Sequence, residues 1–593
     1  MSGSPVAPDS AGTTDHVAVV ADAWRARWPE ALAQWSRFTR LHEPRLCLTG
    51  AEAAAEGLRD SFAMIRMNDQ SVVIDLAQVV ALGLEDHPLE ILGHEIGHHV
   101  LCPANLGDQG RMVARMGWAL PGKEHLAPFI GNLYADLLIN DRLQRGQGLT
   151  MADVYRRLGA DSPDRMWTFY LRTYEVLWRL DRGTLATGPI DARIDSDAQL
   201  GARLLRSYAR RWLEGSGRFA ALCYPYLEDD DGADIRRILA PLRDAEHAGG
   251  VPSGLVEIEP GEQAGAIHPA LDPDLSGVSP SAPAPRPVGA TSAPVEPVAP
   301  PARGGQFREP FEYGALLRSL GIDLDDHEVA IRYYRERAMD QLIPFPTVAV
   351  PASNEPVPEG LVPWSLGADL DDIDWLESLA RSPVVIPGLT TLQREWGTSE
   401  GTDPGREPLD LDLYVDCSGS MPNPQVTVSY LTLAGAIVAL SALRVGGRVQ
   451  ATLWSGPGQY DTTSGFVSDE HQVLAVLTGF IGGSTAFPIH VLRDTFAARR
   501  PTDRPAHVLV ISDDGVTTMF ARDERGNDGW DVAAMALTRG RGGGTLVLNL
   551  PPGWVDPDLE RAAATGWAVE RVQTWDQLVA FARAFSRRTF VQP

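Results

Sequence analysis

Residues 91–103 (ILGHEIGHHVLCP) contain two histidines four positions apart, His94 and His98, with Glu95 directly after the first. On an α-helix, side chains at positions i and i+4 lie on the same face, so both imidazoles could bind one metal ion. Glu95 lies one position round the helix, close enough to accept a proton from a water that the ion makes acidic. His-Glu-x-x-His on a helix is therefore the residue pattern of zinc-dependent hydrolysis.

Two neighbouring segments give this motif a context. Residues 61–67 and 71–75 are rich in β-forming side chains and flank a polar turn, which predicts a β-hairpin. Zinc peptidases place the edge strand that binds an extended substrate just upstream of the motif. Downstream, residues 132–141 (NLYADLLIND) predict a second helix with acidic side chains on one side.

With these segments, the region resembles the gluzincin-like metallopeptidases, and more closely the metallopeptidase-like domain joined to von Willebrand factor A (vWA)-like domains in bacteria. In the larger clan the second helix carries a zinc-binding glutamate, but this chain has Asn132 there, and asparagine is a poor zinc ligand. The resemblance therefore implies that Asp136 is the third zinc ligand beside the two histidines, with Glu95 as the catalytic base. Asp136 could instead support another ligand. The alternatives for the third ligand are His99, His125 and Asp141.

A second motif follows a predicted strand at residues 411–415, where the chain reads Asp-Cys-Ser-Gly-Ser from 416 to 420. Asp-x-Ser-x-Ser at the carboxyl end of a parallel strand resembles the metal-ion-dependent adhesion site (MIDAS) of vWA domains. Its oxygen donors suit Mg²⁺, or Mn²⁺ or Ca²⁺ in its place, and such an ion would bind a carboxylate of a partner protein. The alternative is a serine-containing turn without a metal. The ligands that the resemblance implies are Asp416, Ser418, Ser420, Thr485 and Asp513.

The pattern of helices and strands expected around these residues predicts a multidomain chain. Strands alternating with helices after residue 405 predict a Rossmann-like parallel sheet covered on both faces, whereas the first region is mainly helical (α+β), zincin-like by resemblance. A Pro/Ala-rich tract between them cannot bury a core. The predicted divisions are a disordered 1–15, a metallopeptidase-like domain at 16–245, a flexible linker at 246–309, a helical segment at 310–404 and the vWA-like domain at 405–593.

Composition limits the possible partners. The chain has 593 residues, a formal charge of −26 and a pI of about 4.9, which argues against nucleic acid or anionic lipid. Residues 117–124 have P-loop spacing, but Glu124 occupies the position that needs Ser or Thr, so we expect no ATP site. The four widely spaced cysteines predict free buried thiols, and no signal peptide or apolar stretch of membrane-spanning length is recognisable, so we expect a cytoplasmic protein.

The two motifs together predict a zinc-dependent metallopeptidase, a hydrolase whose vWA domain recruits a protein partner or substrate. Proteins of this composite type resemble members of bacterial stress or conflict systems that pair a vWA protein with a MoxR-type AAA+ ATPase. This resemblance implies an ATPase partner, because the chain has no P-loop of its own. The alternative hypothesis is a catalytically inactive scaffold that binds proteins through the MIDAS, which the asparagine at 132 favours. Metal-dependent insertion or chaperone work with the ATPase is a third possibility.

Overall fold

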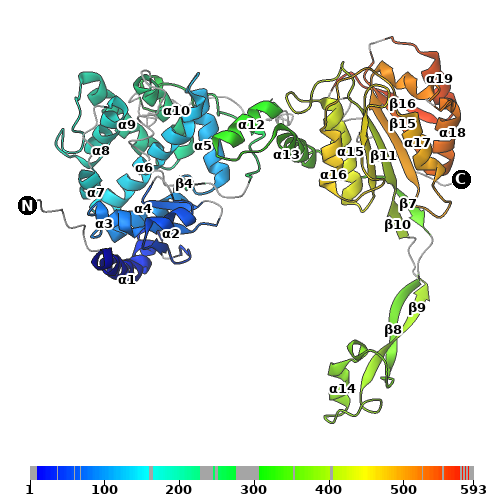
Figure 1. Cartoon of the computed structure of the whole chain (residues 1–593), viewed down its shortest axis with the longest axis horizontal. Helices are drawn as coiled ribbons and strands as arrows, with labels where there is room; N and C mark the ends of the chain where they lie inside the picture. The colour runs from blue at the N-terminus through cyan, green and yellow to red at the C-terminus, as the bar shows by residue number, and fades with distance from the viewer. Residues whose placement is uncertain are drawn as a thin grey trace, which may run out of the picture. The chain divides into compact units, whose positions relative to one another are not determined.

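The computed structural model divides the chain into two compact units, residues 1–329 and 330–593 (Figure 1). The structure describes residues 10–227, 245–246, 251–275, 306–574, 577, 581 and 585, except for 37, 59–60, 67–68, 159–163, 351–353, 401–404, 524 and 551–552. Of the segment predicted to be disordered, residues 1–9 lie outside the described part of the chain, whereas residues 10–15 belong to a helix, so the prediction was wrong for them. Among the described residues, no helix is long and apolar enough to cross a membrane.

The first unit is mainly helical, as predicted, and it contains one four-stranded sheet and one separate two-stranded ladder. The sheet has the order β1-β3-β2-β4, and β2 and β3 form the antiparallel hairpin that the sequence predicts at 61–75. Its elements are α1 (Ser10–Trp35), β1 (Arg45–Cys47), α2 (Gly50–Ala55), β2 (Ala63–Arg66), β3 (Val72–Asp75), α3 (Leu76–Ala81), α4 (Pro88–Val100), α5 (Leu106–Trp118), α6 (Ala127–Gly146), α7 (Met151–Leu158), α8 (Arg165–Trp178), α9 (Ala192–Tyr208), α10 (Trp212–Cys223), β4 (Ala245–Glu246), β5 (Glu257–Ile258), β6 (Gln306–Phe307) and α12 (Pro310–Ser319).

Helix α4 carries the His-Glu-x-x-His motif through the interior of this unit. Pro88 occupies its first turn, where a missing N–H costs nothing and the fixed φ favours helix. Every residue from Leu89 to His98 is buried, so the helix is enclosed on all sides rather than amphipathic. It packs against α1 and α6, which places its polar side chains between helices.

The described ends of the predicted linker differ from a flexible chain. Strands β5 and β6 pair antiparallel, which brings the chain before residue 276 and the chain after residue 305 side by side on the first unit. Glu262 and Arg308 form a buried ion pair there, and Leu255 and Val256 are buried beside it. These few apolar and paired charged side chains hold residues 251–275 and 306–309 on the unit, although the surrounding composition is that of a linker.

The segment predicted to be helical, 310–404, contains the expected helices and an unexpected hairpin. Helices α12, α13 (Asp326–Met339) and α14 (Trp375–Arg381) agree with the helical prediction for this segment. The hairpin is made by β7 (Thr347–Val350) with β10 (Gly405–Pro408) and by β8 (Asn354–Pro363) with β9 (Leu392–Glu400). The prediction of helix was wrong for these strands. Strand β8 contains three prolines, which are unfavourable inside a helix. A two-stranded ladder leaves each strand an open edge where proline is tolerated.

The second unit contains a six-stranded sheet of order β13-β12-β11-β14-β15-β16, parallel except for β13. Helices α15 and α16 cover one face and α17 and α18 the other, so the predicted parallel α/β arrangement is confirmed (Figure 1). The strand order reverses between β11 and β14, which is where doubly wound sheets bind ligands. The elements are β11 (Asp410–Asp416), α15 (Tyr430–Arg444), β12 (Val449–Trp454), β13 (Tyr460–Thr462), α16 (Glu470–Leu477), α17 (Ile489–Ala497), β14 (Ala506–Ser512), α18 (Gly529–Gly540), β15 (Arg541–Leu548), α19 (Pro557–Ala564) and β16 (Trp567–Arg571).

Candidate functional site

Helices α4 and α6 bring His94, His98 and Asp136 together. The Nε2 atoms of the two imidazoles are 3.3 Å apart. The Asp136 Oδ1 atom lies 3.4 Å from Nε2 of His98 and 3.7 Å from Nε2 of His94. All three residues are buried, and they form the group of metal-ligating side chains found among the described residues. The structure therefore places the predicted pair of histidines and the predicted aspartate around one point.

The spacing of these three donor atoms fits a zinc ion. An ion bound tetrahedrally with bonds of about 2.0–2.1 Å needs donor atoms about 3.4 Å apart. The three measured separations, 3.3, 3.4 and 3.7 Å, lie close to that value. The donor set of two imidazoles and a carboxylate is also one that zinc accepts in proteins.

The hydrogen bonds behind the imidazoles fix which nitrogen faces the site. His94 Nδ1 lies 2.7 Å from the side-chain oxygen of Asn140, and His98 Nδ1 lies 3.1 Å from the backbone oxygen of Cys102. An oxygen acceptor requires a hydrogen on Nδ1, so in the neutral rings both Nε2 atoms carry lone pairs. Two lone pairs and a carboxylate oxygen then point into one volume, which a cation stabilises.

A cluster of tyrosines stands behind Asn140. The amide nitrogen of Asn140 donates to the hydroxyl groups of Tyr155 at 3.0 Å and Tyr174 at 2.8 Å. The hydroxyl of Tyr170 lies 3.2 Å from that of Tyr155 and 3.0 Å from that of Tyr174. Burial raises the pKa of Tyr170 and Tyr174 well above their ordinary value, so these hydroxyls keep their protons. The cluster holds the asparagine amide in the orientation that directs its oxygen at His94.

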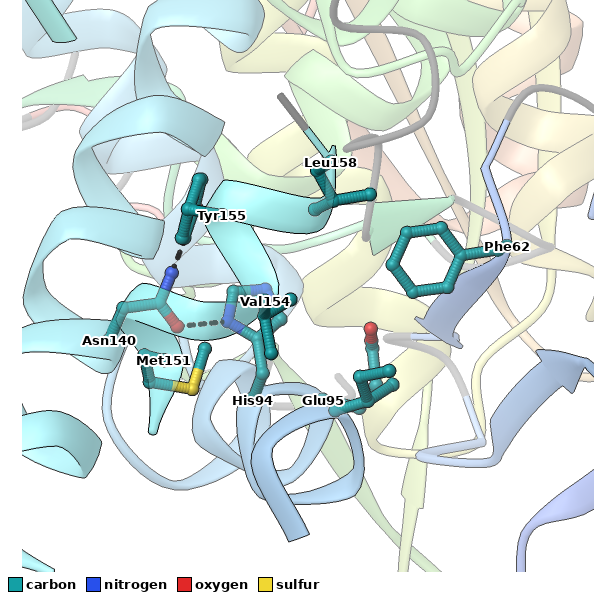
Figure 2. Close-up of a pocket in the computed structure, with 9 residues that line it drawn as sticks. Phe62, His94, Glu95, Asn140, Met151, Val154, Tyr155 and Leu158 are labelled. Atoms are coloured by element: carbon teal, nitrogen blue, oxygen red, sulfur yellow. Dashed lines mark hydrogen bonds between the residues drawn. The ribbon is translucent and has the colours of Figure 1, made fainter. Parts of the chain in front are cut away.

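Glu95 lines a small pocket beside the histidines. Figure 2 shows its carboxylate pointing towards Phe62, with the Asn140–His94 and Asn140–Tyr155 hydrogen bonds on the other side of the pocket. The cavity has a volume of about 30 Å³, which suffices for a water molecule. Its remaining walls are mainly apolar side chains of α4 and α7: Ile91, Met151, Val154 and Leu158. A water in it would lie beside the carboxylate and the imidazole.

Gly97 lets α4 and α6 approach closely enough to form the site. A Cβ atom at this position would lie 2.5 Å from a side-chain carbon of Ile139 on α6 and 2.6 Å from the ring of Trp35 on α1. These distances are far below van der Waals contact, so no larger residue fits without displacing a helix. The glycine inside the motif thus has a packing function, and the ligand geometry depends on it.

The other candidates for the third ligand do not join the cluster. Asp141 is paired with Arg145, whose Nε donates to its Oδ1 at 2.6 Å. His125 lines a separate pocket next to α12. His99 is on the same helix as the motif, but it is not part of the described group of ligating side chains. Asn132, which occupies the position of the clan's glutamate, does not join the group, but its amide nitrogen lies 3.4 Å from Oδ2 of Asp136.

The predicted substrate-binding edge strand is only partly available. Strand β2 lies next to α4, as the resemblance implies, and Phe62 precedes it in the pocket. However, β4 pairs with β2 at Ile65 and Arg66, so β2 is an inner strand of the sheet at these two residues. The chain's own residues 245–246 occupy that part of the edge.

In the second unit, four of the five predicted MIDAS residues form a hydrogen-bonded chain. Ser418 N donates to Asp416 Oδ1 at 2.8 Å, Ser418 Oγ is 3.2 Å from Ser420 Oγ, and Ser420 Oγ donates to Asp513 Oδ2 at 3.1 Å. Thr485 lies nearby, because a Cβ at Gly515 would meet its methyl carbon at 2.2 Å. Asp416 is the last residue of β11, the two serines follow it, and Asp513 follows β14. Thr485 comes from the loop between α16 and α17, so the five oxygen-bearing side chains gather at the reversal of strand order.

Burial raises the pKa of Asp416, although the hydrogen bonds from Ser512 and Ser418 oppose that shift. The Ser512 hydroxyl donates to Asp416 Oδ2 at 2.5 Å. A buried carboxylate of this kind is stabilised in its charged form by a nearby cation. The aspartate, the two serines and the neighbouring Asp513 can therefore supply oxygen donors to a hard divalent ion.

Sequence reasoning missed Asn140 and the tyrosine cluster. Asn140 follows Asp136 by four residues and so lies on the same face of α6, which is a signal that spacing alone provides. Tyr155 comes from a different helix than Tyr170 and Tyr174, and no local pattern joins them. Only the packing of α7 and α8 against α6 shows that their hydroxyls meet.

Comparison with known proteins gives little beyond a weak likeness in structure. No protein-family model and no curated protein matches the sequence. A von Willebrand factor type A structure from Catenulispora acidiphila matches 31% of this chain and 44% of its own, at 17% identity and a TM-score of 0.22. The pilus adhesin SpaC from Lactobacillus rhamnosus GG matches 31% of each chain at 14% identity and a TM-score of 0.23. The chain spans less than half the length of either. The description of the second unit therefore depends on its own strand order and site residues.

Proposed function

We propose that the first unit is a zinc-dependent hydrolase of peptides, with His94, His98 and Asp136 as the zinc ligands and Glu95 as the base. The observation that carries the proposal is the convergence of three buried donor atoms, 3.3 to 3.7 Å apart, with both imidazoles turned to present Nε2. A base next to a metal site and a water-sized cavity is the arrangement that hydrolysis needs.

The chain's own residues divide the work in this proposal. When bound, zinc supplies Lewis acidity, which polarises a substrate carbonyl and makes water more acidic. The Glu95 carboxylate takes the proton of the water in the adjoining cavity and later delivers it to the leaving amine. Asn140 holds the ring of His94, and the apolar walls of the cavity exclude bulk water.

For the second unit we propose that a divalent cation, Mg²⁺ by preference, binds at Asp416, Ser418, Ser420, Thr485 and Asp513 and captures a carboxylate of a partner protein. Hydroxyl ligands leave such an ion short of negative charge, so it favours one more anionic oxygen. The partner that the sequence resemblance suggests is a MoxR-type AAA+ ATPase. The unit would then bring the substrate or the ATPase to the hydrolase.

The test of the hydrolase is cleavage of a quenched-fluorescence peptide library and of unfolded casein by the zinc-loaded full chain. We expect Glu95→Gln to retain zinc and to lose cleavage by at least about 100-fold, the scale of general-base catalysis. Glu90→Gln is the matched control: Glu90 is also buried on α4, where its Oε1 accepts hydrogen bonds from Thr150. Cleavage that survives Glu95→Gln would show that this carboxylate is not the base.

A closed site favours a second candidate function, the inactive scaffold. Glu95 is only 1% exposed, and the cavity beside it, about 30 Å³, is the size of a water molecule rather than of a peptide side chain. In this case the ion would only join α4 to α6 and stabilise the unit. Stoichiometric zinc with no cleavage of any substrate by the wild type, together with partner capture that Asp416→Ala abolishes, would favour the scaffold over the hydrolase.

A further inference from the structure

The hairpin β8–β9 and helix α14 form an element that we name the acidic arm, residues 354–400 (Figure 1). It has a small core of its own, in which Trp364, Ile373 and Leu392 are buried. The backbone N–H of Trp364 donates to the oxygen of Thr391, and the N–H of Asp374 donates to that of Leu392, both at 2.8 Å. The arm is therefore locally folded, and its other apolar side chains are not needed for that core.

Those other apolar side chains are exposed in unusual number. Of the 26 exposed large apolar residues among the described part of the chain, twelve lie in the arm. On α14, Trp375, Leu376 and Leu379 are spaced to share one face, and they are 48%, 79% and 51% exposed. Ser378 is buried on the opposite face and accepts from the backbone of β9 at 2.8 Å. Apolar surface that is not buried in its own domain marks a binding site.

The arm is also strongly acidic. It contains nine Asp and Glu residues against two arginines, a net charge of −7. One of these arginines, Arg394, is already paired with Asp374 at 2.8 Å. The charge and the apolar face occur on the same element, because Asp371 and Asp372 lie just before α14 and Glu377 lies on this helix. This combination requires an occupant that is basic as well as apolar.

A surface hollow on the arm combines both features. Its volume is about 560 Å³, and its walls include Asp371, Asp372, Trp375 and Trp396. Both tryptophans are exposed. A lysine or arginine side chain in this hollow would meet carboxylates and aromatic faces together, which gives both an ionic and a cation–π contact.

We propose that the acidic arm is a docking surface for a partner protein that presents lysine or arginine side chains interleaved with leucine or aromatic ones. A second copy of this chain does not fit, because its own charge of −26 would place like charges in contact. An anionic membrane or a nucleic acid is repelled for the same reason. The arm would then bind basic and apolar side chains of a partner, whereas the MIDAS would bind a carboxylate.

The test is a selection of peptides from a phage-displayed random 12-residue library on the immobilised full chain. The library is first depleted of phage that bind a variant in which a four-residue turn replaces residues 364–391. We expect the enriched peptides to combine Lys or Arg with Leu, Trp or Phe. By fluorescence anisotropy they should bind the wild type, and salt should weaken that binding. The affinity of these peptides should be about tenfold lower for two double variants of the chain. Trp375→Ser/Leu376→Ser removes the apolar anchor, and Asp371→Asn/Asp372→Asn removes the charges beside it. Leu271→Ser, an exposed leucine of the first unit, is the control and should have no effect.

Four results would overturn the proposal. The first is enrichment of peptides without basic residues, and the second is equal affinity of the two arm variants and the wild type. The third is a lowered melting temperature of Trp375→Ser/Leu376→Ser with no effect of Asp371→Asn/Asp372→Asn, which would place these side chains in a core. The fourth is an arm-dependent dimer in sedimentation equilibrium, or arm-dependent binding to vesicles of equal phosphatidylserine and phosphatidylcholine.

Discussion

The orientation of one imidazole depends on a single amide. Asn140 accepts the Nδ1 hydrogen of His94 through its oxygen and donates to Tyr155 and Tyr174 through its nitrogen, so the amide cannot rotate without losing three hydrogen bonds. The ring is thereby held with Nε2 towards Asp136. Residues that support a ligand in this way contribute to metal affinity although they do not touch the ion.

We expect Asn140→Ala to weaken zinc binding by about 10- to 100-fold, because His94 loses the acceptor that fixes its ring. The dissociation constant is measured by competition with a chromophoric chelator. Tyr170→Phe is the control, since this hydroxyl contacts the other two tyrosines but neither Asn140 nor His94, and the affinity should change little. An Asn140→Ala chain that binds zinc as tightly as the wild type would contradict this role.

Individual site residues were predictable from the sequence where spacing on one helix defined them. His94, Glu95 and His98 follow from one helical turn, and Asp136 from a second helix with acids on one side. The choice of Asp136 over His99, His125 or Asp141 came from the resemblance. The residues alone left it open, because nothing in the sequence records which face of α6 meets α4. The contact of Asn140 with the tyrosines of α7 and α8 could not be predicted from the sequence for the same reason.

At the scale of the elements, the contact between α4 and α6 decides whether a site exists. The sequence predicted both helices, the hairpin before them and the strands of the C-terminal sheet. It failed for β8 and β9, whose pairing depends on a partner about 40 residues away in the chain, and for β13 and β16, which are short. Local propensity is a weak guide where such long-range pairing decides the structure.

We expect Gly97→Ala to destabilise the first unit by about 1–3 kcal/mol, because its Cβ would overlap Ile139 and Trp35. Zinc affinity should fall with it, since α4 must move away from α6. The control is Gly93→Ala on the same helix, where the nearest atom to the new Cβ is 3.4 Å away. Thermal unfolding of both variants and chelator competition provide the measurement; equal melting temperatures for the two variants would contradict the close-approach role.

Strand β11 carries a buried acid that makes the second unit sensitive to pH. Burial raises the pKa of Asp412 to about 8, although Tyr414 and the charge of Arg499 lower it. Between about pH 4 and pH 8 the folded chain keeps a proton that the unfolded chain releases. From this group alone, the free energy of unfolding is therefore highest below pH 4 and falls by up to about 1.4 kcal/mol per pH unit as the pH rises towards 8.

We expect Asp412→Asn to remove this dependence, because asparagine has nearly the same shape and does not titrate. By calorimetry of the full chain, the melting temperature of the variant should exceed that of the wild type at pH 8, and the difference should shrink towards pH 5. Asp531→Asn, an exposed position on α18, should keep the wild-type behaviour. A constant difference at all pH values would show that Asp412 does not titrate in this range.

At the scale of the whole molecule, the proposed function places two cation sites of different chemistry in two compact units. The first offers imidazole and carboxylate and suits zinc, whereas the second offers hydroxyls and carboxylates and suits magnesium. The acidic arm is the third surface that we propose for recognition. This division suits a protein that holds its partners by several contacts and acts on one of them.

We expect the two cation sites to bind independently. His94→Ala should abolish zinc binding and leave Mn²⁺ binding at the MIDAS unchanged, and Asp416→Ala should do the reverse. Metal content after dialysis reports the first site, and electron paramagnetic resonance of added Mn²⁺ reports the second. Loss of both ions in either single variant would indicate that the sites are coupled or that the chain has misfolded.

The central claim, a zinc ion held by His94, His98 and Asp136, is tested most directly by X-ray absorption spectroscopy of the zinc-loaded full chain alongside Asp136→Ala. The account predicts one zinc per wild-type chain, two imidazole nitrogens and one or two oxygens at about 2.0–2.1 Å, and an oxygen lost in the variant. Sulfur scattering at about 2.3 Å, or the same spectrum and zinc content in Asp136→Ala as in the wild type, would contradict it.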